Sequence, residues 1–288
     1  MRILCVCMYN EIKTQIPQEV KSDLKSSWEA YLIDLDGTLY HGNRIIPGAE
    51  LLINTMKDRG IPYLFVTNNS SRTQEDVAKH LEDMGIPAHE RDVCTSAVAA
   101  AEYVAELMPG CKVAPIGEHG LLEALKAAGL KLDLDNPDFV IQGIDRTFTY
   151  EKLTQATRWI TGGARYVLTN PDLLLPSHDG LMPGAGTISA AIVAATGVKP
   201  IVIGKPSGIL MKHAIDRLGL RHDQAAVIGD NMLTDITAGI HAGCGTILTL
   251  TGVTTEDNLN YFMTSSGVKP DVICKDLTEI LDLVCGSK

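Results

Sequence analysis

Residues 31–40 read YLIDLDGTLY, a stretch that places two carboxylates, Asp34 and Asp36, at the end of an apolar run. In a β-strand, residues i and i+2 point to the same face, so these side chains would lie about 6 to 7 Å apart. At an effective dielectric constant of about 20, their unscreened repulsion is roughly 2 to 3 kcal/mol. We therefore expect a cation, a shared proton or open water beside them. An acidic turn built on Asp36 and Gly37 is the structural alternative.

The composition limits the class of protein. The chain has 288 residues, of which 45% are hydrophobic, enough for two domains or one large α/β domain. A formal charge of −10 opposes binding to nucleic acid or to anionic lipid, so an anionic substrate would need a local cationic pocket. Seven cysteines without a C-x-x-C pair predict a reducing compartment and no disulfide or zinc framework. No apolar run reaches the ~20 residues that span a bilayer, and we predict a cytoplasmic protein.

Short apolar runs alternate with helical patterns from Tyr31 onward. YLIDLD (31–36) precedes a predicted helix over 48–60, and IPYLFVTNN (61–69) precedes one over 73–85 that ends at Gly85. Later runs with the same character are KPIVIGKP (199–206), AAVIGDN (225–231), GTILTLTG (245–252) and PDVICKD (270–276). This alternation predicts an α/β fold with a doubly wound parallel sheet, in which ligands bind beyond the carboxyl ends of the strands.

The spacing of the runs predicts an inserted domain. A crossover between parallel strands needs about 10 to 12 residues, and far more separate Asn69 from Lys205. We expect a catalytic core over 28–93 and 200–288, an inserted α/β cap over 94–199, and an N-terminal extension over 1–27 with no assigned role. The core strands are expected to pair mainly with one another, so that the core would not depend on the cap.

Polar residues gather where the predicted strands end. They are Asp34, Asp36, Thr67, Asn68, Lys205 and Asp230. Oxygen-rich ligands of this kind suit Mg²⁺, which takes one or two carboxylates and a phosphate oxygen. Each residue also has a structural explanation: Lys205 as a surface lysine, Thr67 and Asn68 as helix caps, Asp230 and Asp235 as turn and cap residues. A divalent cation and a lysine would explain why the two carboxylates of the opening stretch are tolerated.

Together these segments resemble the haloacid dehalogenase superfamily of phosphatases. DLDGT (34–38) is similar to its first motif, VTNN (66–69) to its second, GKP (204–206) to its third and GDNMLTDI (229–236) to its fourth, in the same order. The insertion between the second and third motifs is similar to the large α/β cap of the branch that contains NagD and the 4-nitrophenylphosphatases. The resemblance covers about residues 30–285.

The resemblance implies a Mg²⁺-dependent phosphatase that acts on small phosphorylated metabolites. Asp34 would be the nucleophile and Asp36 the acid and base. Asp34, the backbone carbonyl of Asp36 and Asp230 would hold Mg²⁺, with Asp235 orienting metal-bound water. The phosphoryl oxygens would be held by Thr67, Asn68, Asn69 and Lys205. The resemblance also implies that two copies of the chain can associate through the cap.

The cap is expected to select the substrate, and the sequence does not rank nucleotide, sugar, glycolate or 4-nitrophenyl phosphates. Polar candidates are Arg72, Asn170, Asp172 and His178, each of which a solvated loop explains equally well. Leu175 precedes Pro176 where relatives that act on pyridoxal phosphate have a histidine, which argues against that substrate.

Three other functions remain open at this point. A phosphotransferase or mutase would pass the phosphoryl group from the aspartate to a second substrate. A phospho-receiver signalling protein also uses an acidic cluster, a hydroxyl and a lysine, but needs neither the Asp-x-Asp pair nor a long insertion. A binding module without catalysis is disfavoured, because no motif residue is missing.

Overall fold

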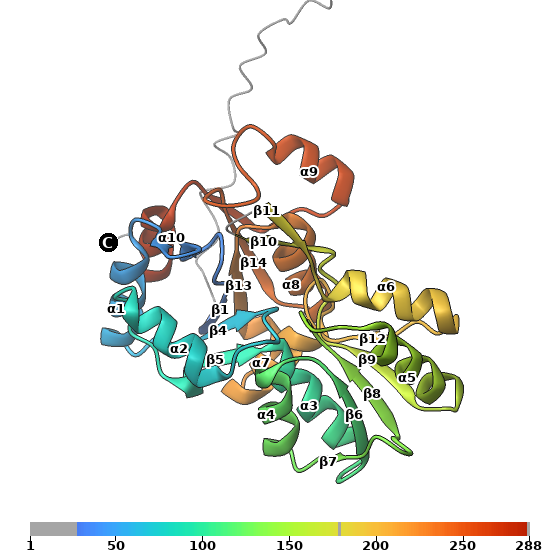
Figure 1. Cartoon of the computed structure of the whole chain (residues 1–288). Coiled ribbons are helices and arrows are strands. Elements are labelled where there is room, and N and C mark those ends of the chain that lie inside the picture. The colour runs from blue at the N-terminus through green and yellow to red at the C-terminus, as the bar shows by residue number, and fades with distance from the viewer. Residues whose placement is uncertain (1–27, 178–179, 287–288) are drawn as a thin grey trace, which may run out of the picture.

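A six-stranded parallel sheet forms the centre of the structure (Figure 1). The computed structural model describes residues 28–177 and 180–286, and the predicted extension over 1–27 lies outside them. The strand order is β15-β14-β13-β1-β4-β5, and each neighbouring pair is parallel. The strands are β1 (Ala30–Ile33), β4 (Tyr63–Thr67), β5 (Val93–Thr95), β13 (Ala225–Gly229), β14 (Gly245–Thr249) and β15 (Val272–Cys274).

Helices cover both faces of this core sheet because successive strand residues point to opposite sides. Tyr31 and Ile33 pack in one hydrophobic cluster, and Leu32 packs in another. The first cluster contains residues of α1 (Ala49–Asp58), α2 (Gln74–Asp83) and α10 (Leu277–Cys285); the second contains residues of α3 (Ser96–Leu107), α7 (Ile209–Leu218) and α8 (Thr237–Ala242). The predicted doubly wound parallel sheet is confirmed.

The helix predicted over 73–85 shows how local sequence sets an element. Thr73 and Asp76 form a capping box, in which each side chain accepts a hydrogen bond from the other residue's backbone N–H. Val77 and Leu81 lie one turn apart and are buried under the core sheet. Gly85 follows with φ +86°, a conformation that favours glycine at the end of a helix.

A second parallel sheet, with the order β12-β9-β8-β6-β7, forms the inserted unit, which we call the cap. Its strands are β6 (Lys112–Ile116), β7 (Lys131–Leu132), β8 (Phe139–Gln142), β9 (Arg165–Leu168) and β12 (Ile201–Val202). Helices α5 (Tyr150–Thr161) and α6 (Ala185–Thr196) pack on one face, and α4 (His119–Ala127) packs on the other (Figure 1).

The two sheets share one hydrophobic cluster. Leu32 and Val66 of the core sheet belong to the same cluster of buried residues as Val113, Phe139 and Val167 of the cap sheet. Helix α3 contributes a row of small residues to this cluster, and α3 and α4 pack against each other. The cap is therefore joined to the core by buried apolar surface as well as by the chain.

The sheet membership of two strands differs from the expected boundaries at 94 and 199. Strand β5 pairs with β4 in the core sheet, so the chain leaves that sheet after Thr95. Strand β12 pairs with β9 in the cap sheet, so the run KPIVIGKP closes the cap instead of adding a core strand. A short apolar run fits a parallel strand in either sheet, and its sequence does not identify its neighbour.

Smaller elements complete the fold. Two hairpins, β2 (Tyr40–His41) with β3 (Arg44–Ile45) and β10 (Leu174–Ser177) with β11 (Gly180–Pro183), were not predicted. A π-helical turn, Met232–Ile236, precedes α8, and α9 (Leu259–Ser266) packs near it. Short 3₁₀ turns lie at Glu90–Asp92 and His222–Gln224. Within the described residues, no helix combines the length and apolarity needed to cross a lipid bilayer.

Candidate active site

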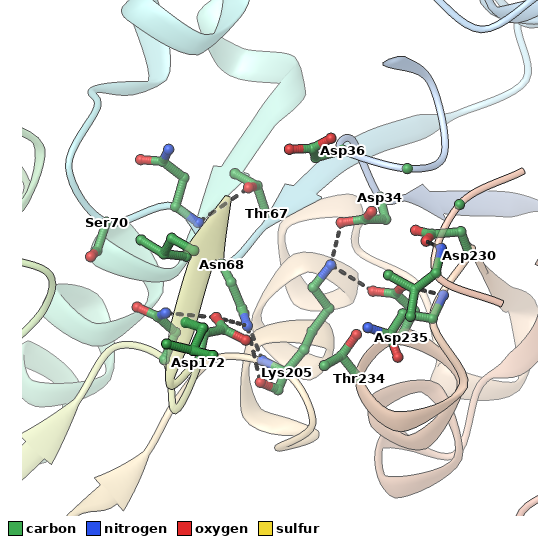
Figure 2. Close-up of a pocket in the computed structure, with 18 of the residues that line it drawn as sticks. Asp34, Asp36, Thr67, Asn68, Ser70, Asp172, Lys205, Asp230, Thr234 and Asp235 are labelled. Carbon is green, nitrogen blue, oxygen red and sulfur yellow. Dashed lines mark hydrogen bonds and ion pairs between the residues drawn. The ribbon is translucent and has the colours of Figure 1, made fainter. Parts of the chain in front are cut away.

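A cavity of about 560 Å³ lies beyond the carboxyl ends of β1, β4 and β13, between the core and the cap (Figure 2). Its core side includes Asp34, Thr67 and Asp230, which each follow or end one of these strands. Its cap side is formed by Ile144, Arg146, Asn170, Asp172, Leu174 and Leu175. Because parallel strands end at the same edge of a sheet, this is where a ligand site is expected in an α/β fold.

Three buried carboxylates form a cluster at the base of this cavity. One oxygen each of Asp34, Asp230 and Asp235 lies within 4.8 Å of the others. Exposed fractions of 8%, 1% and 1%, respectively, show that water solvates little of this charge. Ionised carboxylates in such surroundings need cations or hydrogen-bond donors.

Lys205 supplies one cation to the cluster. Its ammonium group forms an ion pair with Asp34 and a second, at 2.6 Å, with Asp235 (Figure 2). Lys205 is itself 3% exposed and follows β12. The lysine of the GKP segment is therefore a buried residue at the candidate site, and the alternative of a surface lysine is wrong.

Hydrogen-bond donors hold Asp230, the third carboxylate of the cluster. The backbone N–H of Val253 donates to Asp230 Oδ2 at 2.6 Å, and the Thr38 hydroxyl lies 3.2 Å from Asp230 Oδ1 and 3.4 Å from Asp34 Oδ2. Gly37 has φ +91°, and a Cβ atom there would lie 2.5 Å from Asp230 Oδ2. The close approach of this turn to Asp230 thus requires glycine at position 37.

The electrostatic environment shifts the pKa values of these groups. Burial raises the pKa of Asp34 well above its ordinary value and Asp235 adds to the rise, whereas Lys205 opposes it. Burial, followed by the charge of Asp235, raises the pKa of Asp230 to about 6. Burial alone would lower the pKa of Lys205, but Asp235 and Asp34 outweigh this effect and raise it above its ordinary value.

Asp36 differs from Asp34 in its surroundings. Strand β1 ends at Ile33, and the chain turns through Gly37, whose N–H donates to the carbonyl of Tyr40. The strand period of two therefore does not extend through Asp36. Asp36 lines the cavity and is exposed, whereas Asp34 is buried. The two carboxylates of the DLDGT segment thus experience different solvation.

The loop after β4 forms another wall of the cavity. Thr67 Oγ1 accepts a hydrogen bond from the N–H of Asn69 at 3.1 Å, so its own hydroxyl hydrogen can point elsewhere. Asn69 Oδ1 accepts from the N–H groups of Ser71 and Arg72, which orders the loop before α2. The side-chain amide of Asn68 bonds to the backbone of Lys205 instead of capping a helix.

The structure separates the four polar candidates for substrate selection. Asn170 and Asp172 line the cavity, and their side chains are joined by a 2.7 Å hydrogen bond. Arg72 is exposed and does not line the cavity. His178 lies outside the described residues.

Several residues of the site were not predicted. Thr38, Ser70, Arg146 and Val253 all line or brace the cavity. The Ser70 hydroxyl accepts a hydrogen bond from the N–H of Ile144 in the cap at 3.1 Å. Thr38 stands in the DLDGT segment and Val253 follows another strand end, so both positions carried a signal, whereas nothing in the sequence marks the Ser70 contact.

The donor set fits a hard divalent cation. The clustered atoms are carboxylate oxygens, and such ligands suit Mg²⁺, whereas soft metals prefer sulfur or imidazole. Among the described residues that line the cavity, five carboxylates face two cationic side chains, Lys205 and Arg146. The excess negative charge is consistent with a bound cation.

Comparisons with known proteins agree with this geometry. A family model described as haloacid dehalogenase-like hydrolase matches residues 31–131, and a second, HAD-hydrolase-like model matches residues 202–280. The 5'-nucleotidase YutF of Bacillus subtilis is 44% identical over 253 residues, 88% of this chain and 97% of that protein. An acid sugar phosphatase of Staphylococcus saprophyticus is 43% identical over 256 residues, 88% of this chain and 97% of that protein.

Solved structures give the same result for the fold. A p-nitrophenyl phosphatase from Archaeoglobus fulgidus superposes with a TM-score of 0.84 and 36% identity, covering 88% of this chain and 98% of that chain. NagD from E. coli superposes with a TM-score of 0.81 and 32% identity, with the same coverage. The resemblance found in the sequence is confirmed. The chain therefore belongs to the haloacid dehalogenase-like hydrolases, in their NagD-like branch, and is a phosphoric monoester hydrolase.

Proposed function

We propose that this chain is a Mg²⁺-dependent phosphatase that hydrolyses small phosphomonoesters through an aspartyl-phosphate on Asp34. The observation that carries the proposal is the contrast between its two neighbouring carboxylates. Asp34 is buried in contact with Lys205, and Asp36 is exposed at the same cavity. Two carboxyl groups in different environments can take different roles, one as nucleophile and one as acid and base.

The reaction would proceed in two displacements. An oxygen of Asp34 attacks phosphorus as the bond to the ester oxygen breaks, and Asp36 gives its proton to the departing oxygen. Asp36 then takes a proton from water, which attacks phosphorus and releases phosphate from Asp34. Dividing hydrolysis in this way replaces one difficult step with two easier ones.

The metal would be held by Asp34, the backbone carbonyl of Asp36 and Asp230, and Asp235 would orient its water. When bound, Mg²⁺ supplies positive charge that offsets the negative charge of the carboxylates and the phosphoryl group. Asp235 already accepts from the N–H of Asn231 at 3.1 Å and pairs with Lys205, so its orientation is fixed.

The phosphoryl oxygens would be held by Thr67, Lys205 and the backbone at Asn68 and Asn69. Thr67 and Lys205 both line the cavity, and the ammonium group of Lys205 lies beside the proposed nucleophile. Such fixed charges stabilise a phosphoryl group in transfer because they need no rearrangement during the reaction.

Small phosphorylated metabolites are the proposed substrates. The relatives are named for nucleotides, sugar phosphates and p-nitrophenyl phosphate. A cavity of about 560 Å³ is of the size that binds small molecules. Association through the cap, the cytoplasmic location and the lack of nucleic-acid and membrane partners stay predictions from the sequence.

The test combines turnover with trapping. Phosphate release from 4-nitrophenyl, nucleoside and sugar monophosphates is measured with Mg²⁺ and with EDTA. Borohydride added during turnover reduces an acyl phosphate, so mass spectrometry should find homoserine in place of Asp34. Asp34→Asn should release no phosphate and give no such product. Turnover by that variant at the normal rate would contradict the covalent mechanism, and one phosphate released per ester consumed would separate hydrolysis from phosphoryl transfer to a second substrate.

A further inference from the structure

The side chain of Asn68 fixes the backbone of Lys205 at two points. Asn68 Oδ1 accepts from the N–H of Lys205 at 2.8 Å, and Asn68 Nδ2 donates to the carbonyl of Lys205 at 3.0 Å (Figure 2). Asn68 follows a strand of the core sheet, and Lys205 follows a strand of the cap sheet. This amide therefore sets where the lysine begins its path toward Asp34.

A cap carboxylate adds a third contact that favours the same orientation of that amide. Asp172 Oδ2 accepts from Asn68 Nδ2 at 3.0 Å and from Asn170 Nδ2 at 2.7 Å. If the amide of Asn68 were reversed, its oxygen would face the carboxylate of Asp172 and the carbonyl of Lys205, and its NH₂ group would face the N–H of Lys205. All three contacts would then be repulsive, so Asp172 favours the observed orientation.

Close packing keeps these groups in place. The N–H of Gly204 donates to the carbonyl of Thr169 at 2.8 Å. A Cβ atom on Gly204 would lie 2.4 Å from that carbonyl oxygen and 2.5 Å from Asn68 Oδ1. A Cβ atom on Gly184 would lie 2.2 Å from the carbonyl oxygen of Asp172. Backbone approaches this close leave little room for the amide or the carboxylate to shift.

We infer that Asp172 is a positioning residue, which acts through Asn68 to place Lys205 against Asp34 and the phosphoryl group. The inference rests on the proposed function, in which Lys205 holds phosphoryl oxygens. The opposing reading is that Asp172 contacts the leaving group. Positioning predicts equal effects for all substrates, whereas a leaving-group contact predicts effects that differ among them.

The kinetic test uses Asp172→Ala, Asn68→Ala and the double variant, with 4-nitrophenyl phosphate, a nucleoside monophosphate and a sugar phosphate. Because an error of about 1 Å at a reacting group can lower a rate by about 100-fold, we expect Asp172→Ala to lower kcat by about 10- to 100-fold. KM should rise as well, because Lys205 also holds the phosphoryl group of the bound ester, and the loss in kcat/KM should be similar for every substrate. In the Asn68→Ala background, Asp172→Ala should have no further effect, because its intermediary is already absent.

Two conservative variants and a control sharpen the result. Asp172→Asn retains one accepting oxygen and should recover most of the activity, whereas Asp172→Glu displaces the carboxylate and should not. Thermal unfolding establishes that each variant is folded, and Asp172→Glu carries the test if Asp172→Ala does not fold. Asp135→Ala removes an exposed cap carboxylate away from the cavity and should leave kcat unchanged.

A binding measurement separates this inference from the proposed function. Isothermal titration with inorganic phosphate reads the Lys205 site without turnover, and Asp172→Ala should weaken that binding by about 10-fold or more while Asp135→Ala does not. If the wild-type chain releases no phosphate from any ester, the proposed function fails, and phosphate binding still decides the role of Asp172. Additive losses in the double variant, a loss confined to one class of substrate, or unchanged phosphate binding would each overturn the inference.

Discussion

Asp230→Asn is expected to stabilise the metal-free protein while removing its response to Mg²⁺. The carboxylate of Asp230 is 1% exposed, and its surroundings raise its pKa from 3.8 to about 6. Each pKa unit corresponds to about 1.4 kcal/mol, so ionising Asp230 costs the folded protein up to about 3 kcal/mol. Asparagine removes this charge and nearly keeps the shape.

The hydrogen bonds of Asp230 can be kept by the amide. Its oxygen can accept from the N–H of Val253, and its NH₂ group can donate to the hydroxyl oxygen of Thr38, the two partners that hold the carboxylate now. We therefore assign the change in stability mainly to the charge, and expect the free energy of unfolding in EDTA at pH 7.5 to increase by about 2 to 3 kcal/mol.

The sign of the pH dependence follows from the raised pKa. The folded protein binds the proton of Asp230 more tightly than the unfolded chain does. The penalty is therefore absent below about pH 4, grows between about pH 4 and 6, and is complete above about pH 6. The difference in stability between Asp230→Asn and the wild type should follow the same course.

Mg²⁺ should reduce or reverse this difference in stability. A ligand at 100 times its dissociation constant stabilises the folded state by about 2.7 kcal/mol, so saturating Mg²⁺ should raise the wild type toward or above the variant. Urea unfolding of the wild type and the variant in EDTA and in Mg²⁺, each at pH 7.5 and at pH 4.5, measures the stability difference under all four solution conditions. Asp135→Asn serves as an exposed control. A variant less stable than the wild type in EDTA at pH 7.5, or equal stabilisation of both by Mg²⁺, would refute the reasoning.

Three further predictions concern the same cavity. Asp36→Asn should lower kcat/KM more for alkyl phosphates than for 4-nitrophenyl phosphate, because nitrophenolate leaves almost without a proton; equal losses would count against the acid role. Exhaustive chelation should stop phosphate release and Mg²⁺ should restore it, so activity that survives EDTA would exclude the metal assignment. Gly37→Ala should lower the urea midpoint and the turnover, because its Cβ would lie 2.5 Å from Asp230 Oδ2 at a φ of +91°, and an unchanged midpoint would show that the turn can relax.

The convergence of the strand ends could be predicted from the sequence. Asp34, Thr67 and Asp230 stand at the ends of neighbouring parallel strands, and parallel order brings those ends to one edge. The period of the apolar runs identifies such strands without any knowledge of their partners. The catalytic and binding roles of these residues remain proposals, because position alone does not establish chemistry.

The contacts between distant segments could not be predicted. Asn68 bonds to Asp172 across 104 residues and to Lys205 across 137 residues. No local pattern encodes such pairs. The family resemblance implied that Asn68 holds phosphoryl oxygens, and Asp172 was one of four polar candidates for a substrate contact that a solvated loop explains equally well. The short strand β12 posed the same difficulty, since two residues with apolar neighbours can pair in either sheet.

The position of Lys205 bears on how the cap and core work together. Lys205 lies where the chain returns from β12 of the cap. Ile203, two residues earlier, is buried in the hydrophobic cluster that the two sheets share. The backbone N–H of Lys205 donates a hydrogen bond to Asn68 of the core, and that of the preceding Gly204 donates to Thr169 of the cap. Moving the cap as a rigid body would strain these contacts and uncover part of the shared apolar surface, which is unfavourable in water. The arrangement argues against a core that is independent of its cap, because the lysine beside the proposed nucleophile is placed by both.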